Sequence, residues 1–424
     1  MNDKKLEKNL RISTSKRATI ERHSVMKCRS FTVKIQENKL SKLQKEQLKM
    51  LFVEAKWFKN HILNWSSQEN NSLWKFDTKT KEIEHKDKNG NSLFSTLKYL
   101  PASIKQSLLN DMISNVKTLH TLKSNGNKVG KLKFVKEVKS LSYKQFNVTH
   151  KILTSKQIKL QGISGKIQVN GLNQFLNICD IEICNARLLN TPSGYYVQFV
   201  TYIPKENKKL SNGKTIGIDF GCSTSFTTSE GVKADAFVRE SERLKRLQRK
   251  FARQEKGSKR RAKTLNLIKI EYQKLTNQKN DLANKLVAKF LENETIVIQD
   301  EQLKNWHKNG HGKAVQHSVL GRVKSKLILS PKTVVLGKTV PTTKLCTKCG
   351  VFHDELKVWD RVFNCACGVN EDRDIHAAQN MVWFYKNNIG VERTKFTRME
   401  MKALVEVALF SNQDQLLSLK CEAS

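Results

Sequence analysis

Acidic residues end three short structural signals that lie far apart in this sequence. Asp219 ends an apolar run of strand length, and Gly221 permits a sharp turn beside its carboxylate. Asp300 and Glu301 follow a second apolar run, and only one of them can face the same side as Asp219 because side chains alternate along a strand. Asp374 stands where a helix is predicted to begin, a position that favours an acid as a cap and through the helix dipole.

Each acid taken alone has a plain structural interpretation, as a turn residue, a solvated strand end or a helix cap. Taken together, the acids indicate metal chemistry. Carboxylates within a few ångströms of one another raise one another's pKa, so the cluster is stable at neutral pH mainly when divalent cations lie among them. Two Mg²⁺ ions about 4 Å apart activate a water and stabilise the leaving oxygen in phosphodiester hydrolysis. The three segments therefore predict a two-metal nuclease.

A second constellation consists of cysteines. Cys346 and Cys349 form one close pair, Cys365 and Cys367 form another, and a glycine follows each pair. Four thiolates can close a tetrahedral Zn²⁺ shell, and each glycine lets the chain turn so that backbone N–H groups face sulfur. The spacing predicts one structural zinc in a reducing compartment, with His353 as a possible substitute ligand.

The elements around the acids differ in character. The first acid ends a short buried strand at 214–221, and a run dense in positive charge follows over 239–263 before a long amphipathic helix. Basic runs are often only solvated faces, but in so cationic a chain this one is predicted to lie along a phosphate backbone. The residues expected to bind nucleic acid are Arg243, Arg246, Arg249, Lys250, Arg253, Lys259, Arg260 and Arg261.

The first half of the chain has a β texture interrupted by helical signals. Residues 1–24 are basic and polar and are expected to form a flexible arm. A strand is predicted at 28–35, and apolar residues recur at helical spacing over 40–66 and 103–122. Alternating segments predict further strands at residues 131–138, 151–160, 165–169 and 195–203.

The overall charge points to a polyanionic partner. Lys and Arg number 77 against 39 Asp and Glu, a formal net charge of +38 over 424 residues. No apolar window of about 18 residues could span a bilayer, and the N-terminus lacks the apolar region of a signal peptide. We therefore expect a cytoplasmic protein with no membrane partner that binds nucleic acid.

With these features in view, the chain resembles the TnpB family of transposon-encoded RNA-guided nucleases and their relatives, the compact type V CRISPR effectors. The resemblance is clearest over 214–381. Residues 217–221 look like the first RuvC motif of that family and 296–303 like the second. The zinc finger, followed directly by 372–380, looks like the third.

The resemblance implies that Asp219, Glu301 and Asp374 are the catalytic residues and the Mg²⁺ ligands, with Asp300 as the alternative to Glu301. Two departures from the family pattern stand out. The second motif usually reads Glu-Asp-Leu, whereas here Gln-Asp-Glu-Gln-Leu shifts the acid. The asparagine commonly found two places after the last acid is His376 here.

For the fold, the resemblance implies a multidomain α+β and α/β chain. A β-barrel wedge domain is interrupted by a helical recognition lobe, and an RNase H-like (RuvC) nuclease domain with an inserted zinc finger follows. The expected boundaries are 1–24 for the basic arm, 25–39 and 124–212 for the wedge domain, 40–123 for the recognition lobe, 213–340 and 371–424 for the nuclease domain, and 341–370 for the zinc finger.

For the partners, the resemblance implies a guide RNA and a double-stranded DNA target that is opened into an RNA–DNA hybrid and a displaced strand. The chain is expected to recognise a short DNA motif beside the target, to act as a monomer or homodimer, and to occur in the prokaryotic cytosol or nucleoid. Three alternatives remain open: an RNA-guided DNA-binding regulator without cleavage, an actin-like ATPase that shares the glycine-flanked first Asp, and a transposase that uses the same acids for strand transfer.

Overall fold

The computed structural model describes residues 3–68, 71–86, 90–205, 211–306, 312–357, 359–391, 397 and 399–409. The chain divides into two units, Met1–Asn207 and Lys208–Ser424, each with its own hydrophobic core. Within the described segments, no helix combines the length and the apolarity that crossing a bilayer requires.

A seven-stranded antiparallel sheet forms the centre of the first unit. Its strand order is β4-β8-β9-β1-β7-β6-β5. The strands are β1 (Met26–Ile35), β4 (Ser140–Tyr143), β5 (His150–Thr154), β6 (Gln157–Leu160), β7 (Ile167–Asn170), β8 (Glu182–Thr191) and β9 (Gly194–Pro204).

The two ends of this sheet approach each other. β4 and β5 are the outermost strands, yet the Tyr143 hydroxyl donates a hydrogen bond to the Gln161 carbonyl just after β6 at 3.1 Å. The rings of Tyr143 and His150 also meet edge to face, with centroids 6.4 Å apart. The sheet therefore curls toward the shape of a barrel, and its inner side chains form a core with Phe175 and Phe199.

Helices α2 (Lys42–Ser66) and α3 (Ala102–Ser124) pack into the same core. α2 begins with a capping box in which the Ser41 hydroxyl accepts the N–H of Gln44. The buried Glu54 carboxylate of α2 accepts the N–H groups of residues 98, 99 and 100, which fixes the segment that leads into α3. The predicted helices and the predicted strands at 28–35, 165–169 and 195–203 are present, and the predicted β segment at 151–160 forms the hairpin of β5 and β6.

Three features of the first unit differ from the expectations. Residues Asp3–Ser24, expected as a flexible arm, form helix α1, since a run of Lys, Glu, Leu and Arg has high helix propensity. Residues 131–138, expected as a strand, have no regular structure. The segment 40–123, expected to be helical, also contains a hairpin of β2 (Glu82–Lys86) and β3 (Ser92–Thr96), whose polar residues give little strand signal.

The second unit contains a mixed five-stranded sheet in the order β12-β11-β10-β13-β14. β10, β13 and β14 run parallel, whereas β11 and β12 are antiparallel additions to the β10 edge. The strands are β10 (Thr215–Phe220), β11 (Phe226–Thr228), β12 (Lys233–Ala234), β13 (Thr295–Gln299) and β14 (Thr333–Leu336).

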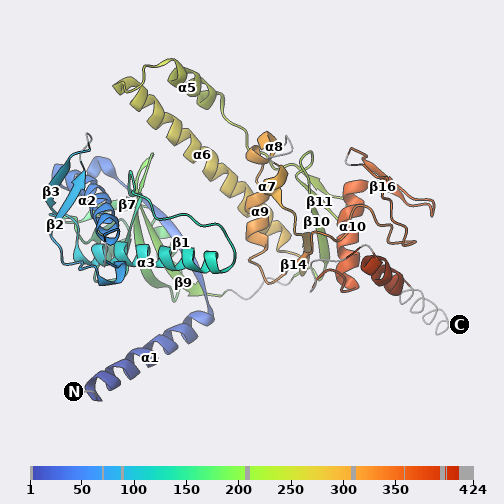
Figure 1. Ribbon diagram of the computed structural model, residues 1–424, viewed down its shortest axis with the longest axis horizontal. Coiled ribbons are helices and arrows are strands. Elements are labelled where there is room, and N and C mark those ends of the chain that lie inside the picture. Colours follow the sequence, from blue (N-terminus) through green and yellow to red (C-terminus); the bar gives the residue numbers. More distant parts are fainter. Residues whose placement is uncertain are drawn as a thin grey trace. The chain divides into compact units, whose positions relative to one another are not determined.

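Helices cover both faces of this sheet (Figure 1). On one face, α6 (Lys259–Phe290) and α9 (Leu320–Leu327) pack against the isoleucines of β10 and β13. On the other face lies α10 (Arg373–Lys386), and a Cβ on Gly217 would stand 2.0 Å from the Ala378 carbonyl oxygen. Glycine at 217 is therefore required for α10 to lie this close to β10.

The remaining elements of the second unit are short or peripheral. α5 (Glu242–Arg253) and α6 form an antiparallel helical pair that extends away from the sheet (Figure 1). Two short helices follow β13, namely α7 (Leu303–Trp306) and α8 (Gly312–His317). A two-stranded sheet of β15 (Val362–Asn364) and β16 (Asn370–Asp372) precedes α10, and a further helix occupies 399–409.

Candidate active site and metal centre

The first two predicted acids lie at one edge and on one face of the mixed sheet. β10 and β13 are parallel neighbours, with Ile218 opposite Ile298. Since side chains alternate, Asp219 shares a face with Gln299, and Glu301 two residues further along continues on that side. The carboxyl ends of both strands therefore bring Asp219 and Glu301 together.

Asp219 and Glu301 lie in an environment that disfavours their negative charges. The Asp219 side chain is buried, and this burial raises its pKa well above the usual range; the charges of Glu301 and Asp374 raise it further. Burial also raises the pKa of Glu301 to about 7, although the ammonium of Lys324 opposes the rise. Perturbed carboxyl groups of this kind are typical of functional sites.

Asp374 comes to this site from the first turn of α10. The helix is capped by Asp372, whose Oδ1 accepts the N–H groups of Asp374 and Ile375 at 3.1 and 3.2 Å. The expected capping role therefore belongs to Asp372, and the Asp374 carboxylate is not used for it. The Arg373 guanidinium donates to Asp374 Oδ1 at 3.1 Å and also lowers the pKa of Asp219 against the larger effect of burial.

Asp300 and Glu301 point to different environments. The Asp300 side chain is 58% exposed and pairs with Lys324 Nζ at 3.3 Å. The same ammonium donates to the Glu301 carbonyl oxygen at 2.6 Å. Lys324 therefore holds a turn that directs Asp300 toward solvent and leaves Glu301 beside Asp219.

The carboxylates fit a hard cation. Magnesium prefers oxygen ligands, and Glu301 Oε2 is buried without a hydrogen-bond partner among the described residues. Asp219, Glu301 and Asp374 do not belong to the groups of described residues whose ligand atoms all lie within 4.8 Å. At least two of their ligand atoms are therefore more than 4.8 Å apart. This spacing is wider than that of three carboxylates bound to a single ion.

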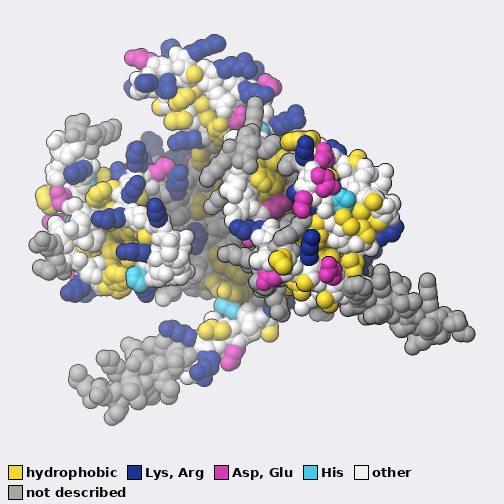
Figure 2. Space-filling view, turned by 45° about the vertical axis from the view of Figure 1, so that its right-hand side comes forward, with side chains coloured by type: hydrophobic (Ala, Val, Ile, Leu, Met, Phe, Trp, Pro, Cys, Tyr) yellow, Lys and Arg dark blue, Asp and Glu magenta, His cyan; other side chains and the backbone are white. Residues whose placement is uncertain are grey.

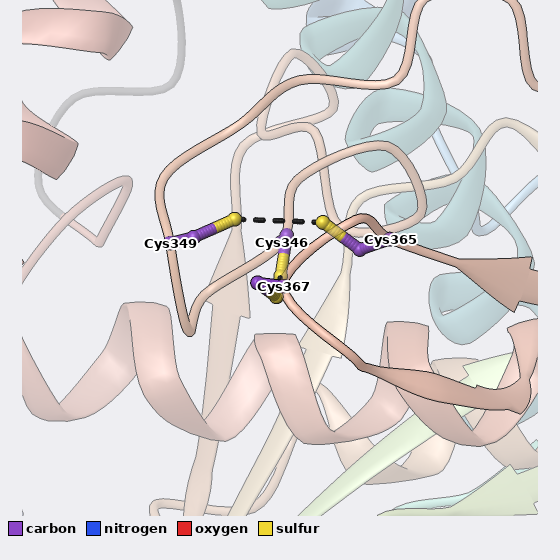
Figure 3. A group of neighbouring side chains, drawn as sticks. All are labelled: Cys346, Cys349, Cys365 and Cys367. Carbon is purple, nitrogen blue, oxygen red and sulfur yellow. Dashed lines mark hydrogen bonds between the residues drawn. The ribbon is translucent and has the colours of Figure 1, made fainter.

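The four clustered cysteines are brought together as the sequence predicts (Figure 3). Their sulfur atoms all lie within 4.8 Å of one another, and the pairs Cys346–Cys367 and Cys349–Cys365 are each 3.5 Å apart. Zinc–sulfur bonds of about 2.3 Å with tetrahedral angles require sulfur atoms about 3.8 Å apart, so the group fits Zn²⁺. The cluster could bind a structural zinc.

The turns of this cluster have the predicted geometry. The glycines after the two pairs, Gly350 and Gly368, have φ angles of 77° and 90°, in the left-handed region that favours glycine. His353, the possible substitute ligand, is not part of the sulfur group among the described residues; its Nδ1 lies 2.9 Å from the Glu355 carboxylate.

A buried polar network connects the cysteine cluster with the acidic site. The Asn380 amide of α10 donates to the carbonyls of Thr342 and Leu345 at 2.7 and 2.8 Å, and its oxygen accepts the Thr347 hydroxyl. The Thr342 hydroxyl donates in turn to Gln299 Oε1 at 3.0 Å, at the end of β13. The network therefore connects the cysteine cluster to the strand that leads to Glu301.

His376, where the family commonly has asparagine, belongs to the same network. Its Nδ1 lies 2.7 Å from Glu371 Oε1, its Nε2 lies 2.7 Å from the Leu345 carbonyl, and its ring stacks on Phe363. The side chain is buried and fastens the cysteine cluster to α10.

The predicted basic residues lie on α5 and at the start of α6. Figure 2 shows Lys and Arg side chains gathered at the top of the view, where this helical pair lies in Figure 1. Arg261 has an intramolecular role, because its guanidinium donates to the carbonyls of Phe251 and Gln254 and stacks on the Phe251 ring at 3.9 Å. Arg243 pairs with Glu271 at 3.5 Å. The remaining six are exposed; they are Arg246, Arg249, Lys250, Arg253, Lys259 and Arg260.

Sequence reasoning did not find Lys324, Arg373 or Gln299. Lys324 and Arg373 are single basic residues in a chain with 77 of them, so no local pattern sets them apart. Arg373 lies between two aspartates, which is the one available signal.

Comparisons with known proteins bear on the second unit above all. Residues 198–307 match the family model OrfB_IS605, described as "Probable transposase", and residues 320–381 match the model "Cas12f1-like, TNB domain". A Streptomyces pristinaespiralis protein named "Putative RNA-guided DNA endonuclease" is 31% identical over 177 residues, which are 39% of this chain and 44% of that protein. This chain therefore matches less than half the length of that relative.

A solved structure was also found, a "Cryo-EM structure of the Cas12f1-sgRNA-target DNA complex". Its sequence is 14% identical to this chain. The structural match covers 80% of this chain and 81% of that one, with a TM-score of 0.40.

The mixed sheet, the three acids and the adjoining cysteine cluster all lie in the second unit. The two family models match the segments that contain Asp219 with Glu301, and the cysteine cluster with Asp374. The predicted resemblance to the TnpB-like nucleases and compact type V effectors is confirmed.

Proposed function

We propose that this chain is an RNA-guided DNA endonuclease that hydrolyses phosphodiester bonds with Mg²⁺ held by Asp219, Glu301 and Asp374. The observation that carries the proposal is the convergence of these acids at one sheet edge, where burial and mutual repulsion raise the pKa of Asp219. Such an arrangement is costly for folding and is stabilised when cations bind among the acids. The nuclease activity named for the relative is consistent with it.

Each residue has a distinct role in this proposal. Asp219 and Glu301 act as carboxylates that hold cations from the sheet, while Asp374 does so from the first turn of α10. Bound Mg²⁺ supplies an activated water and charge stabilisation at the leaving oxygen. Lys324 keeps Glu301 in position, and Arg373 compensates negative charge beside Asp374.

We further propose that the second unit is an RNase H-like (RuvC) domain and that the exposed basic residues of α5 and α6 contact a nucleic-acid backbone. Helices on both faces of the mixed sheet and the net charge of +38 support these assignments. In this proposal base pairing with a guide RNA reads the target, and the protein recognises a short flanking DNA motif. The partners would be the guide RNA and double-stranded DNA.

The test begins with the RNA that copurifies with the full chain. Once this RNA is sequenced, a matched DNA duplex with randomised flanks is incubated with the complex in Mg²⁺ or in EDTA. We expect the DNA to be cut in Mg²⁺ and to remain intact in EDTA. Asp219→Ala, Glu301→Gln and Asp374→Asn should each lower the cleavage rate about 100-fold or more, because a metal ligand is worth several kcal/mol of transition-state stabilisation.

Asp300→Asn is the matched control, since Asp300 neighbours Glu301 but faces solvent. It should change the rate by no more than about threefold, as surface substitutions usually do. If Asp300→Asn greatly lowers the cleavage rate and Glu301→Gln does not, Asp300 and not Glu301 is the second catalytic acid.

The description of the first family model, "Probable transposase", favours a transposase as the second candidate function. The same cleavage assay separates the functions, because strand transfer gives joined DNA products without a matched RNA. Tight RNA-dependent binding without cuts in Mg²⁺ would instead show a guided DNA-binding regulator, and the endonuclease proposal would be wrong.

A further inference from the structure

A second group of possible metal ligands lies in the first unit, where the end of α1 meets the sheet. His23, Glu182 and Cys184 present a nitrogen, an oxygen and a sulfur atom that all lie within 4.8 Å of one another. His23 Nε2 is 3.2 Å from Glu182 Oε1, and Cys184 Sγ is 3.9 Å from the same oxygen. Ligands around a tetrahedral zinc ion stand about 3.3–3.8 Å apart, given bonds of 2.0–2.3 Å.

The strand register puts a fourth candidate beside this group. Cys28 of β1 stands opposite Tyr202 of β9, and Tyr202 stands opposite Glu182 of β8. Residues in register on adjacent strands face the same side of a sheet, so Cys28, Tyr202 and Glu182 form one row. The His23 ring stacks on Tyr202 with centroids 3.5 Å apart, which sets the imidazole over this row.

His23 faces the Glu182 carboxylate. Its Nε2 is buried and lies 3.2 Å from Glu182 Oε1, but the contact is not a well-aligned hydrogen bond. The lone pair of a neutral ring nitrogen is repelled by a carboxylate oxygen that it faces. A metal ion bound by both atoms would remove this repulsion.

Arg22 is compatible with an ion at this place. Its guanidinium donates to both oxygens of Glu182 at 3.0 Å. Its side chain is 56% exposed, so it can keep its bond to Oε2 while Oε1 binds a metal. A divalent ion with two thiolates and one carboxylate has a net charge of about −1, which Arg22 offsets.

We propose that His23, Glu182 and Cys184 form a second transition-metal site, suited to Zn²⁺, with the fourth position filled by Cys28 or water. The nitrogen and sulfur ligands favour zinc over magnesium or calcium. The ion would join the end of α1 to β8. The Arg22–Glu182 ion pair also joins these two segments, and the His23–Tyr202 stack joins α1 to the neighbouring strand β9. The site is independent of the proposed nuclease activity, because all its residues belong to the first unit.

The test is the zinc content of the full-length protein after dialysis against a weak chelator. We expect about two equivalents for the wild type, one from the four-cysteine cluster and one from this site. His23→Gln and Cys184→Ser should each lower the content to about one equivalent. Cys179→Ser is the matched control, since Cys179 is an exposed free cysteine five residues before Cys184, and it should retain both equivalents.

His23→Gln changes only the last turn of a peripheral helix, so it remains informative if Cys184→Ser fails to fold. Hydrogen exchange adds a second measurement: with zinc, the amides of residues 14–24 should be protected relative to His23→Gln. A wild-type content of one equivalent that Cys349→Ser abolishes would overturn the proposal. So would two equivalents that persist in both His23→Gln and Cys184→Ser.

Discussion

Lys324 contacts both acids that follow β13, and its contacts give these two neighbours different surroundings. Its ammonium pairs with the exposed Asp300 and donates to the Glu301 carbonyl oxygen. The sequence places two acids side by side, but strand alternation and this lysine direct Glu301 alone toward Asp219. In the proposed active site, Lys324 would be a positioning residue for Glu301.

Lys324→Gln tests that role. We expect the cleavage rate to fall about 10- to 100-fold, as for other residues that orient metal ligands, and the Mg²⁺ concentration for half-maximal rate to rise. Lys326→Gln on the same helix is the control, because Lys326 is exposed. If Lys324→Gln lowers the rate without changing the Mg²⁺ dependence, the lysine has only a structural role.

At the scale of elements, the packing of α10 on β10 sets the position of Asp374. The helix can approach because residue 217 has no side chain, and the buried Ala377 and Ala378 leave the helix surface flat. One glycine and two alanines therefore determine how far the third acid stands from the first.

Gly217→Ala tests this contact. A Cβ would meet the Ala378 carbonyl oxygen at 2.0 Å, which backbone atoms cannot easily relieve. We expect a loss of about 1–3 kcal/mol or more in the free energy of unfolding, measured by denaturant titration. Gly321→Ala in α9 is the control, since its nearest neighbour is 3.9 Å away, and it should stabilise the protein by up to about 1 kcal/mol. Equal effects of the two substitutions would contradict the packing argument.

The cysteine cluster is the second element that supports the acids. Cys349→Ser should abolish zinc binding at the cluster, release the contacts that Thr347 and His376 make, and lower cleavage about 10- to 100-fold. Zinc content, cleavage rate and the unfolding of the first unit are the measurements. The first unit should unfold as in the wild type. Full cleavage after loss of this zinc would show that the network is not needed for the acids.

At the scale of the whole molecule, the two units have separate cores and separate titrating groups. His150 lies in the core of the first unit, where burial lowers its pKa to about 4. The native state therefore keeps this ring neutral at pH values where the unfolded chain, with an ordinary pKa near 6.5, binds a proton.

The stability of the first unit should consequently depend on pH. The free energy of unfolding that the neutral His150 ring contributes is fully present above about pH 6.5. It is lost as the pH falls toward 4, and the loss reaches up to about 3 kcal/mol. His150→Gln should flatten this dependence, whereas His120→Gln on the exposed side of α3 should leave it unchanged. Unfolding followed at pH 5 and pH 7 measures the difference. The same slope in His150→Gln and in the wild type would contradict the assignment.

Much of this protein follows from local patterns in its sequence. Period-two and helical spacing predict β1, α2 and α3, because these elements bury one face. The cysteine spacing predicts the four-cysteine cluster, because the cysteines and the turn glycines lie within one short segment. The segment 131–138 and the hairpin β2–β3 were not predicted correctly, since their polar and alternating residues have little net preference without their tertiary contacts.

Only the tertiary structure decides the features that depend on segments far apart in the chain. The meeting of Asp219, Glu301 and Asp374, the inward direction of Glu301, and the neighbourhood of His23, Glu182 and Cys184 all require parallel or antiparallel register between distant strands. A residue's type determines its chemistry, and local spacing determines its face. Which other side chains share that face depends on strand pairing and helix packing, which no local pattern specifies.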